Sequence, residues 1–306
     1  MDIVDAQVHI APVGKAYGPG PLEAGSGIID STLDAMNAVG IRSVIIDEYW
    51  FWVAPPKPMQ ILPGNELANG AWRAAFPIAQ LAGILHPDRF CAFVRVDRRD
   101  PQLESVMRVL ASTPQVRAFR SLAVWNPEEA RQFMGGGYDR VFEIAQDLGL
   151  PMCMAIQGFV EYLPQYAKKF PKLQFIVDHW GMGIPFNTAQ RPEADLRRSI
   201  SLEYLDEIMK LAEHPNIALK IGHAQMHFKA KRYPFEEVRP HLRRAIKAFG
   251  ADRLTWGSDK TIAQPPFSWM ELLNSLKDDP ELSQEEKELI LGKNARRLYN
   301  WPAPAA

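Results

Sequence analysis

Histidine and carboxylate side chains stand at the ends of several apolar runs of this sequence. Asp5, Gln7 and His9 alternate with apolar residues in the first run, His179 ends the sixth run, and Asp259 ends the eighth. Imidazole and carboxylate groups are the side chains that most often move protons or bind divalent cations in enzymes. These residues predict an acid–base or metal-dependent site, provided that the fold brings the ends of these runs together.

Eight short apolar runs alternate with helix-like stretches and are the candidate strands. The runs span residues 2–10, 41–47, 89–97, 116–121, 151–157, 173–179, 216–222 and 253–259. Helices are expected near residues 30–39, 66–85, 101–111, 137–148, 160–169, 201–213, 235–249 and 268–278. This rhythm predicts an α/β fold, a distorted (β/α)8 barrel of the TIM type, as a single domain over residues 1–306. A doubly wound sheet would also alternate, but no glycine-rich phosphate loop follows the first run.

Alternation within the strands predicts which side chains face the barrel interior. In the first run Asp5, Gln7 and His9 share one face, which we expect to point inward, while the apolar residues between them face the helices. The same rule places Arg95 and Arg120 inside the barrel. These positions fall toward the carboxyl ends of their strands, where barrel enzymes build their sites.

Two loops are unusually long for a compact domain. Residues 48–65 follow the second run and carry Tyr49 and three further aromatic residues, and residues 180–200 follow the sixth run and begin with Trp180. Long loops of this kind are often lids or binding loops. We expect Tyr49 and Trp180 to line the pocket, with a dimer contact or a local mini-core as the alternative for the aromatic loop.

Composition excludes several classes of protein. The chain has 306 residues, with 35 Lys plus Arg against 36 Asp plus Glu, and this balance argues against a dedicated nucleic-acid binder. No apolar run approaches the roughly 20 residues of a membrane span. The acidic start lacks the cationic region of a secretory signal, and Cys91 and Cys153 are too few for a disulfide framework. We therefore expect a cytoplasmic protein with buried, unpaired cysteines.

The motifs D-x-Q-x-H at residues 5–9, D-H-W-G at 178–181 and W-G-S-D at 256–259 resemble the amidohydrolase superfamily. The similarity is to the amidohydrolase-related family, the branch with aminocarboxymuconate-semialdehyde decarboxylase and 2-pyrone-4,6-dicarboxylate lactonase. Residues 86–97 and 290–301 extend the resemblance over nearly the whole chain. It implies the same barrel fold and an enzymatic function.

The resemblance also implies where a metal would bind. The family's ligand positions fall on Gln7, His9, Gln157 and Asp259, and its catalytic histidine falls on His179. Glutamine is a poor substitute for imidazole at zinc or manganese. We therefore expect no metal cofactor; a Zn or Mn ion held by His9, His179 and Asp259 at low occupancy is the alternative.

The lactonase branch implies a route without a metal. Asp259 would take a proton from water, and the water would attack a lactone or ester carbonyl polarised by His179 and His9. Arg120, Gln7 and Gln157 would contact the substrate, although Arg120 could instead pair with Asp97 or Asp47. His223, near the end of the seventh run, is a further candidate contact.

The expected function is hydrolysis of a lactone or ester in a small anionic organic acid. A metal-dependent decarboxylase or hydratase of the same family is the first alternative. A ligand-binding barrel with a decayed metal site and no turnover is the second. We expect no nucleic-acid or membrane partner, and a homodimer is left open.

Overall fold

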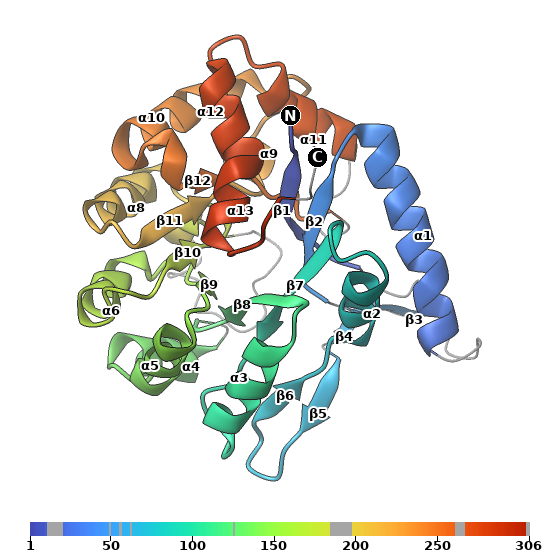
Figure 1. Cartoon of the computed structure of the whole chain (residues 1–306). Helices are drawn as coiled ribbons and strands as arrows, with labels where there is room; N and C mark the ends of the chain where they lie inside the picture. Colours follow the sequence, from blue (N-terminus) through green and yellow to red (C-terminus); the bar gives the residue numbers. More distant parts are fainter. Residues whose placement is uncertain are drawn as a thin grey trace.

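The computed structural model describes residues 1–10, 21–48, 50–54, 57–61, 63–124, 126–183, 198–260 and 267–303, with residues 21–26, 50–54 and 57–61 described for their backbone alone. Eight parallel strands form one sheet in the order β1-β2-β7-β8-β9-β10-β11-β12 (Figure 1). The strands are β1 (Val4–Val8), β2 (Ser43–Ile46), β7 (Phe90–Arg95), β8 (Val116–Ser121), β9 (Met152–Met154), β10 (Phe175–Val177), β11 (Ile217–Lys220) and β12 (Leu254–Thr255). Each strand lies within one of the eight predicted runs, and the predicted (β/α)8 barrel is confirmed.

Backbone hydrogen bonds close the barrel between its first and last strands. The N–H of Asp259 donates to the Gln7 carbonyl at 2.9 Å, and the N–H of His9 donates to the Lys260 carbonyl at 3.1 Å. A parallel bridge also pairs Val8 with Lys260. The segment after β12 is therefore hydrogen-bonded to β1 and His9 at the candidate catalytic residues.

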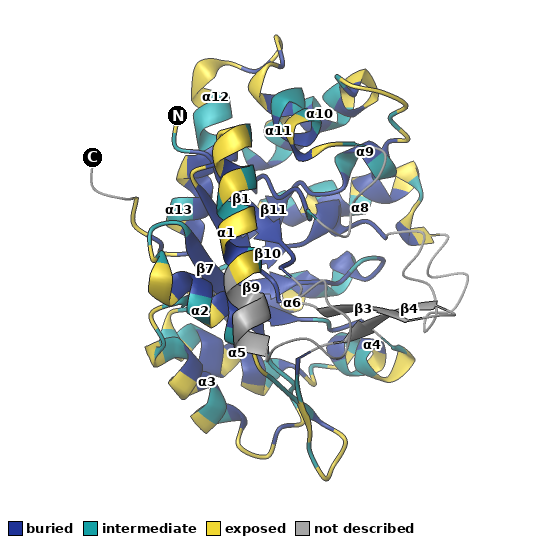
Figure 2. Ribbon diagram, turned by 90° about the vertical axis from the view of Figure 1, so that its right-hand side faces the viewer, coloured by how far each residue is buried: buried dark blue, intermediate teal, exposed yellow. Residues whose placement is uncertain are grey.

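Helices surround the strands, and their outer faces carry most of the exposed residues (Figure 2). The longer helices are α1 (Pro21–Val39), α2 (Pro77–Leu85), α3 (Leu103–Ser112), α4 (Pro127–Met134), α5 (Asp139–Leu148), α6 (Leu163–Lys169), α8 (Leu205–Lys210), α10 (Arg239–Phe249) and α11 (Trp269–Lys277). Short helices are α9 (Ala224–His227), α12 (Gln284–Glu288) and α13 (Asn294–Leu298). None of these described helices has the length and apolarity of a membrane span.

Some expected elements differ in the structure. The helix expected over residues 66–85 occupies only Pro77–Leu85, because residues before it form the hairpin β5 (Gly64–Glu66) and β6 (Trp72–Ala74). The helices α4, α9, α12 and α13 were not anticipated. Asn126 starts α4 by accepting a hydrogen bond of 2.9 Å from the N–H of Glu129, and a proline follows it at the first helical position.

The long loops are described only in part. The loop over residues 48–65 contains two antiparallel strands, β3 (Trp50–Ala54) and β4 (Lys57–Ile61), whose side chains lie outside the description, as does Tyr49. Residues 184–197 of the loop after β10 are also outside the described residues. The predicted pocket-lining role of Tyr49 stays a prediction.

One hydrophobic cluster fills the barrel interior. Every strand of the eight-stranded sheet except β12 contributes to it, and residues in and after α13 extend it. Both cysteines belong to this cluster and are buried, as predicted. Its strand members are Val4, Ala6, Ile45, Cys91, Phe93, Ala118, Cys153, Ile176 and Ala218.

The alternation predicted for the first strand is wrong at its start. Val4 and Ala6 lie in the interior cluster, whereas Val8 packs in the larger cluster that includes the helices. The pairing register of β1 shifts between Asp5 and Val8, and such a shift changes which residues share a face. As a result, Asp5 contacts Trp269 of α11 instead of pointing into the barrel.

Candidate active site

The Asp259 carboxylate is the centre of a hydrogen-bonded group at the carboxyl ends of the strands. Its Oδ1 lies 2.6 Å from Nε2 of His9 and accepts a hydrogen bond of 2.8 Å from Nε2 of Gln7. Its Oδ2 contacts Nε2 of His223. The carboxylate is 2% exposed, so these groups take the place of water around it.

Charge in this group is fixed by burial and by the neighbouring histidines. Burial raises the pKa of Asp259, but His9, His223 and His179 outweigh it and hold this pKa well below its usual range. Burial lowers the pKa of His179 well below its usual value, and the nearby His223 lowers it further. At neutral pH the site therefore combines an ionised Asp259 with a neutral His179.

His9 is held from both sides of its ring. Its Nδ1 lies 2.8 Å from the backbone carbonyl of Asp47, and its Nε2 faces Asp259. Both nitrogens meet oxygen atoms, so the ring is oriented from both edges. This arrangement fixes the plane and the position of the imidazole between β1, β2 and the turn after β12.

Left-handed backbone conformations turn the site residues after the strands end. His179 has φ of 52°, Trp180 of 60°, His223 of 58° and Asp259 of 55°. Residues other than glycine seldom adopt this conformation, which costs roughly 1–2 kcal/mol per residue. Such strained residues cluster at functional sites, and here they follow three neighbouring strands.

A buried ionic network lies beside the histidines. Nε of Arg120 donates to Oδ2 of Asp178 at 2.9 Å, and Nζ of Lys220 lies 2.7 Å from Oδ1 of the same carboxylate. Arg120 also contacts Asp47, to which Arg95 donates at 2.5 Å. Burial raises the pKa of Asp178, but Lys220 and Arg120 outweigh it and hold this pKa below its usual range.

The network includes one of the two carboxylates expected as partners of Arg120. Arg120 contacts Asp47, whereas Asp97 pairs with Arg99 at 2.6 Å. Alternation correctly placed Arg95 and Arg120 inside the barrel. The predicted contact of Arg120 with substrate stays a prediction.

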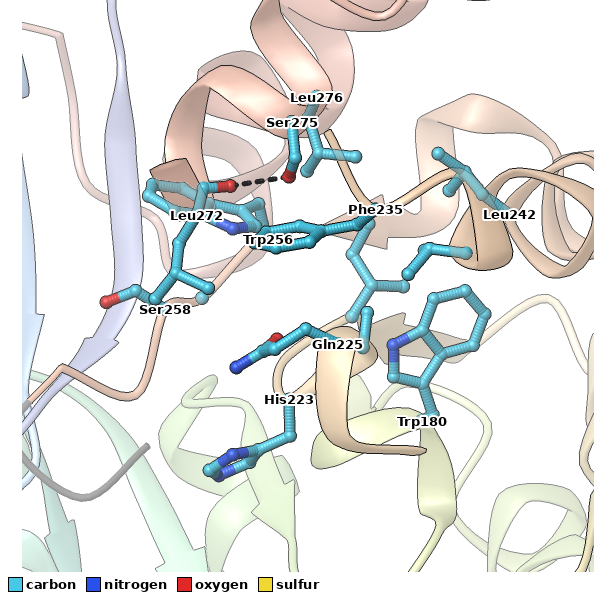
Figure 3. A pocket seen from close by; sticks show the side chains of 14 residues that line it. Trp180, His223, Gln225, Phe235, Leu242, Trp256, Ser258, Leu272, Ser275 and Leu276 are labelled. Atoms are coloured by element: carbon cyan, nitrogen blue, oxygen red, sulfur yellow. Dashed lines mark hydrogen bonds between the residues drawn. The ribbon is translucent and has the colours of Figure 1, made fainter. Parts of the chain in front are cut away.

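Two other predicted residues lie apart from Asp259. Gln157 is half-buried beyond the end of β9, and the hydrogen bonds among the described residues do not involve its side chain. Trp180 is fully buried and lines a cavity of about 30 Å³ between the ends of β11 and β12 and helices α10 and α11 (Figure 3). Trp180 packs edge-to-face on Phe228, with ring centroids 5.0 Å apart.

The fully buried Lys220 was missed in the sequence, although a signal for it was present. It stands in the largely apolar run 216–222, two residues after the interior residue Ala218. Alternation at this position already places a positive charge inside the barrel. Its partner Asp178 is the first residue of the D-H-W-G motif.

Three site residues could hold a divalent cation. Ligand atoms of His179, His223 and Asp259 lie within 4.8 Å of one another. Two imidazoles and a carboxylate form a donor set that catalytic zinc sites use. The Nδ1 atoms of His179 and His223 are buried and have no partner in the described structure. The residues fit a cation, with His223 in the place where we expected His9.

The fold and this group define a parallel (β/α)8 enzyme whose site lies at the carboxyl ends of its strands. The amidohydrolase family model matches residues 66–301, and the chain belongs to this family. The family assignment makes the chain an enzyme of the hydrolase type and confirms the resemblance seen in its motifs.

A lactonase is among the relatives of this chain. An L-fucono-1,5-lactonase from Burkholderia ambifaria is 30% identical over 182 residues, and the match covers 55% of this chain and 57% of the lactonase. This chain thus spans little more than half the length of that relative.

Two solved structures share the fold over nearly the whole chain. An amidohydrolase from Burkholderia multivorans with bound zinc has a TM-score of 0.68 and 18% identity, covering 99% of this chain and 100% of that one. A protein from Pseudomonas putida described as a 2-pyrone-4,6-dicarboxylic acid hydrolase has a TM-score of 0.63 and 18% identity, covering 98% of each chain.

The buried ionic network predicts a large effect of Lys220→Met on stability. The substitution leaves Asp178 with less compensation, and we expect the free energy of unfolding to fall by about 3–5 kcal/mol. Adding Asp178→Asn should recover most of this loss. Because the pKa of Asp178 is lowered by folding, its contribution is present above about pH 4 and is lost as the pH falls.

Urea denaturation at several pH values measures this effect. The exposed Lys277 supplies a matched control, and Lys277→Met should leave the unfolding midpoint unchanged. A Lys220→Met protein as stable as this control would contradict the proposed role of the network.

Proposed function

We propose that this enzyme hydrolyses a lactone or a similar ester of a small organic acid, with Asp259 accepting a proton from the attacking water. The observation that carries the proposal is the buried, ionised Asp259 carboxylate surrounded by His9, His179 and His223. The L-fucono-1,5-lactonase relative supports the choice of a lactone.

Asp259 has an acceptor position left for one more hydrogen bond. A carboxylate offers about four lone-pair positions. Gln7, His9 and His223 occupy three of them, which leaves a position for an O–H of water. The low pKa of Asp259 makes it a weak base, so the rate must come mainly from the orientation of water and substrate.

His179 is suited to stabilise the oxyanion. Attack of water on the carbonyl places negative charge on the carbonyl oxygen, and a neutral imidazole can donate an N–H to it. Collapse of the tetrahedral intermediate breaks the ester C–O bond. The proton taken up by Asp259 then passes to the departing alkoxide, which regenerates the carboxylate.

Gln7 supplies both a donor and an acceptor. Its Nε2 is used on Asp259, and its buried Oε1 has no partner among the described residues. Gln7 was expected to contact the substrate. Because Nε2 is bonded to Asp259, Oε1 is the atom left for this contact, and it would accept a hydrogen bond from the water or from a substrate hydroxyl.

Interior charge supports an anionic substrate. Arg95, Arg120 and Lys220 place three positive charges near the two carboxylates Asp47 and Asp178. This network exceeds its two carboxylates by one positive charge, and such an excess beside the site would favour an anion. A cytoplasmic location and homodimer formation remain part of the proposal.

When bound, a divalent cation held by His179, His223 and Asp259 would act as a Lewis acid and lower the pKa of water. The steps proposed above use only the side chains of this chain. The two routes differ in whether removal of metal removes activity.

Asp259→Asn is expected to lower turnover on a lactone by roughly 10²–10⁴-fold, the usual scale for one acid–base group. The protein should still fold, because a neutral His223 can accept a hydrogen bond from the new amide in its other tautomer. Turnover on a panel of lactones and esters, together with thermal unfolding of the same preparation, measures both effects.

The exposed Asp206 provides the matched control, and Asp206→Asn should retain full activity. Normal turnover by folded Asp259→Asn protein would rule out the general-base role. A panel in which one compound binds with micromolar affinity but none is hydrolysed would favour the ligand-binding alternative.

The purified enzyme is expected to keep its lactonase activity after dialysis against a chelator. Gln7 directs an amide N–H, which cannot ligate a metal, at Asp259. Metal content per chain by mass spectrometry and turnover, before and after dialysis, test this expectation. Loss of about one equivalent of zinc or manganese together with activity would replace the proposal by the metal-dependent alternative.

A further inference from the structure

Asp5 links the strand that carries Gln7 and His9 to the turn that carries Asp259. Its side chain is fully buried. Oδ1 of Asp5 accepts hydrogen bonds from the peptide N–H of Ser258 at 2.8 Å and from that of Gln7 at 3.1 Å. One oxygen therefore fastens both segments that meet in the Gln7–Asp259 hydrogen bond.

The turn after β12 depends on such fastening, because Asp259 has a left-handed backbone conformation, with φ of 55°. Three successive peptide N–H groups of the turn have defined acceptors. Ser258 donates to Asp5, Asp259 donates to the Gln7 carbonyl at 2.9 Å, and Lys260 donates to the Ser258 hydroxyl at 3.0 Å. Two of these three acceptors belong to β1.

The other oxygen of Asp5 is anchored in the helical layer. Oδ2 accepts a hydrogen bond of 2.8 Å from Nε1 of Trp269, the first residue of α11. Ser268 and Glu271 cap this helix with reciprocal hydrogen bonds, so the indole is itself held in place. Within the described residues, the groups that bond to the carboxylate are these three N–H donors and the Ser258 hydroxyl, and none is a charged side chain.

We propose that Asp5 is a positioning residue that sets the orientation of Asp259. It acts through the Ser258 peptide and not through substrate, because it is fully buried and contacts α11. The kinetic part of this inference rests on the proposed hydrolysis, whereas the orientation of the turn can be measured without a substrate.

Protonation of Asp5 should loosen the turn. Burial raises the pKa of Asp5 to about 6, and hydrogen bonds from Ser258, Trp269 and Gln7 offset only part of this rise. The peptide and indole N–H groups can only donate, so an added carboxyl hydrogen must either displace one of these contacts or turn to the Ser258 hydroxyl, which already accepts from the Lys260 N–H. Either change alters a contact within the turn. Turnover should therefore decrease as the pH falls through about 6.

Folding stability should move in the opposite direction. The folded pKa of Asp5 is raised, so its contribution to stability is complete below about pH 4 and is lost as the pH rises through about 6. If Asp5 only stabilised the fold, turnover would not decrease at low pH, where its contribution to stability is largest.

The test compares Asp5→Asn with Trp269→Phe. The amide of Asp5→Asn keeps one acceptor but turns its NH₂ toward an N–H donor. We expect kcat to fall by roughly 10²-fold, the scale of a small misplacement, with KM little changed and no transition near pH 6.

Trp269→Phe leaves Oδ1 and its contacts in place, so it should retain kcat at high pH. Its transition should shift to higher pH, because the indole hydrogen bond lowers the pKa.

Nitrogen-15 NMR of the histidine rings provides the measurement that needs no substrate. His9 and His223 contact Asp259, and their signals should shift in Asp5→Asn if the turn moves. If Asp5→Asn does not fold, the double variant with Trp269→Phe removes the opposing N–H and takes its place.

The outcomes separate the two proposals. Wild-type kcat and unshifted histidine signals in the folded variant would overturn the role of Asp5. A wild-type enzyme that hydrolyses no lactone would refute the proposed function. In that case shifted histidine signals in Asp5→Asn would still support the positioning role of Asp5, and unshifted signals would refute it.

Discussion

The ionised carboxylate of Asp259 is the group around which the site is organised. Its hydrogen-bond partners come from distant parts of the chain: Gln7 lies in β1, His9 directly follows β1, and His223 lies after β11. A buried carboxylate is tolerated only when such donors replace its water. The closed barrel is thus a condition for the charge, and the site exists only where the first and last strands meet.

The ionic network beside the histidines extends the same constraint. Replacing a buried ion pair by apolar residues is often neutral or stabilising, so such pairs are weak evidence for stability alone. Here Asp47 and Asp178 also each adjoin a histidine of the site. The Asp47 backbone carbonyl faces Nδ1 of His9, and Asp178 directly precedes His179. Arg120, which contacts both carboxylates, therefore couples the positions of the two imidazoles.

Much of this architecture could be predicted from residue pattern. Alternation located Arg95 and Arg120 correctly, and the family motifs brought His9 and Asp259 together. The register shift in β1 has no signature in a period-two pattern, and so the outward position of Asp5 was not foreseen. The contact of His223 with Asp259 depends on a left-handed conformation at His223, which is uncommon for any residue other than glycine and which local sequence does not specify.

The orientation of Gln7 follows from chemistry alone. An ionised carboxylate only accepts hydrogen bonds, so the amide must present its NH₂ group to Asp259. Its oxygen is then directed away from the carboxylate, and it is left as a buried acceptor. A glutamine that only filled the space of a lost histidine would need neither feature. Compared with a metal-ligating imidazole, the amide offsets part of the charge on Asp259 and adds an acceptor beside it, and that acceptor suits a ligand that brings an O–H or N–H of its own.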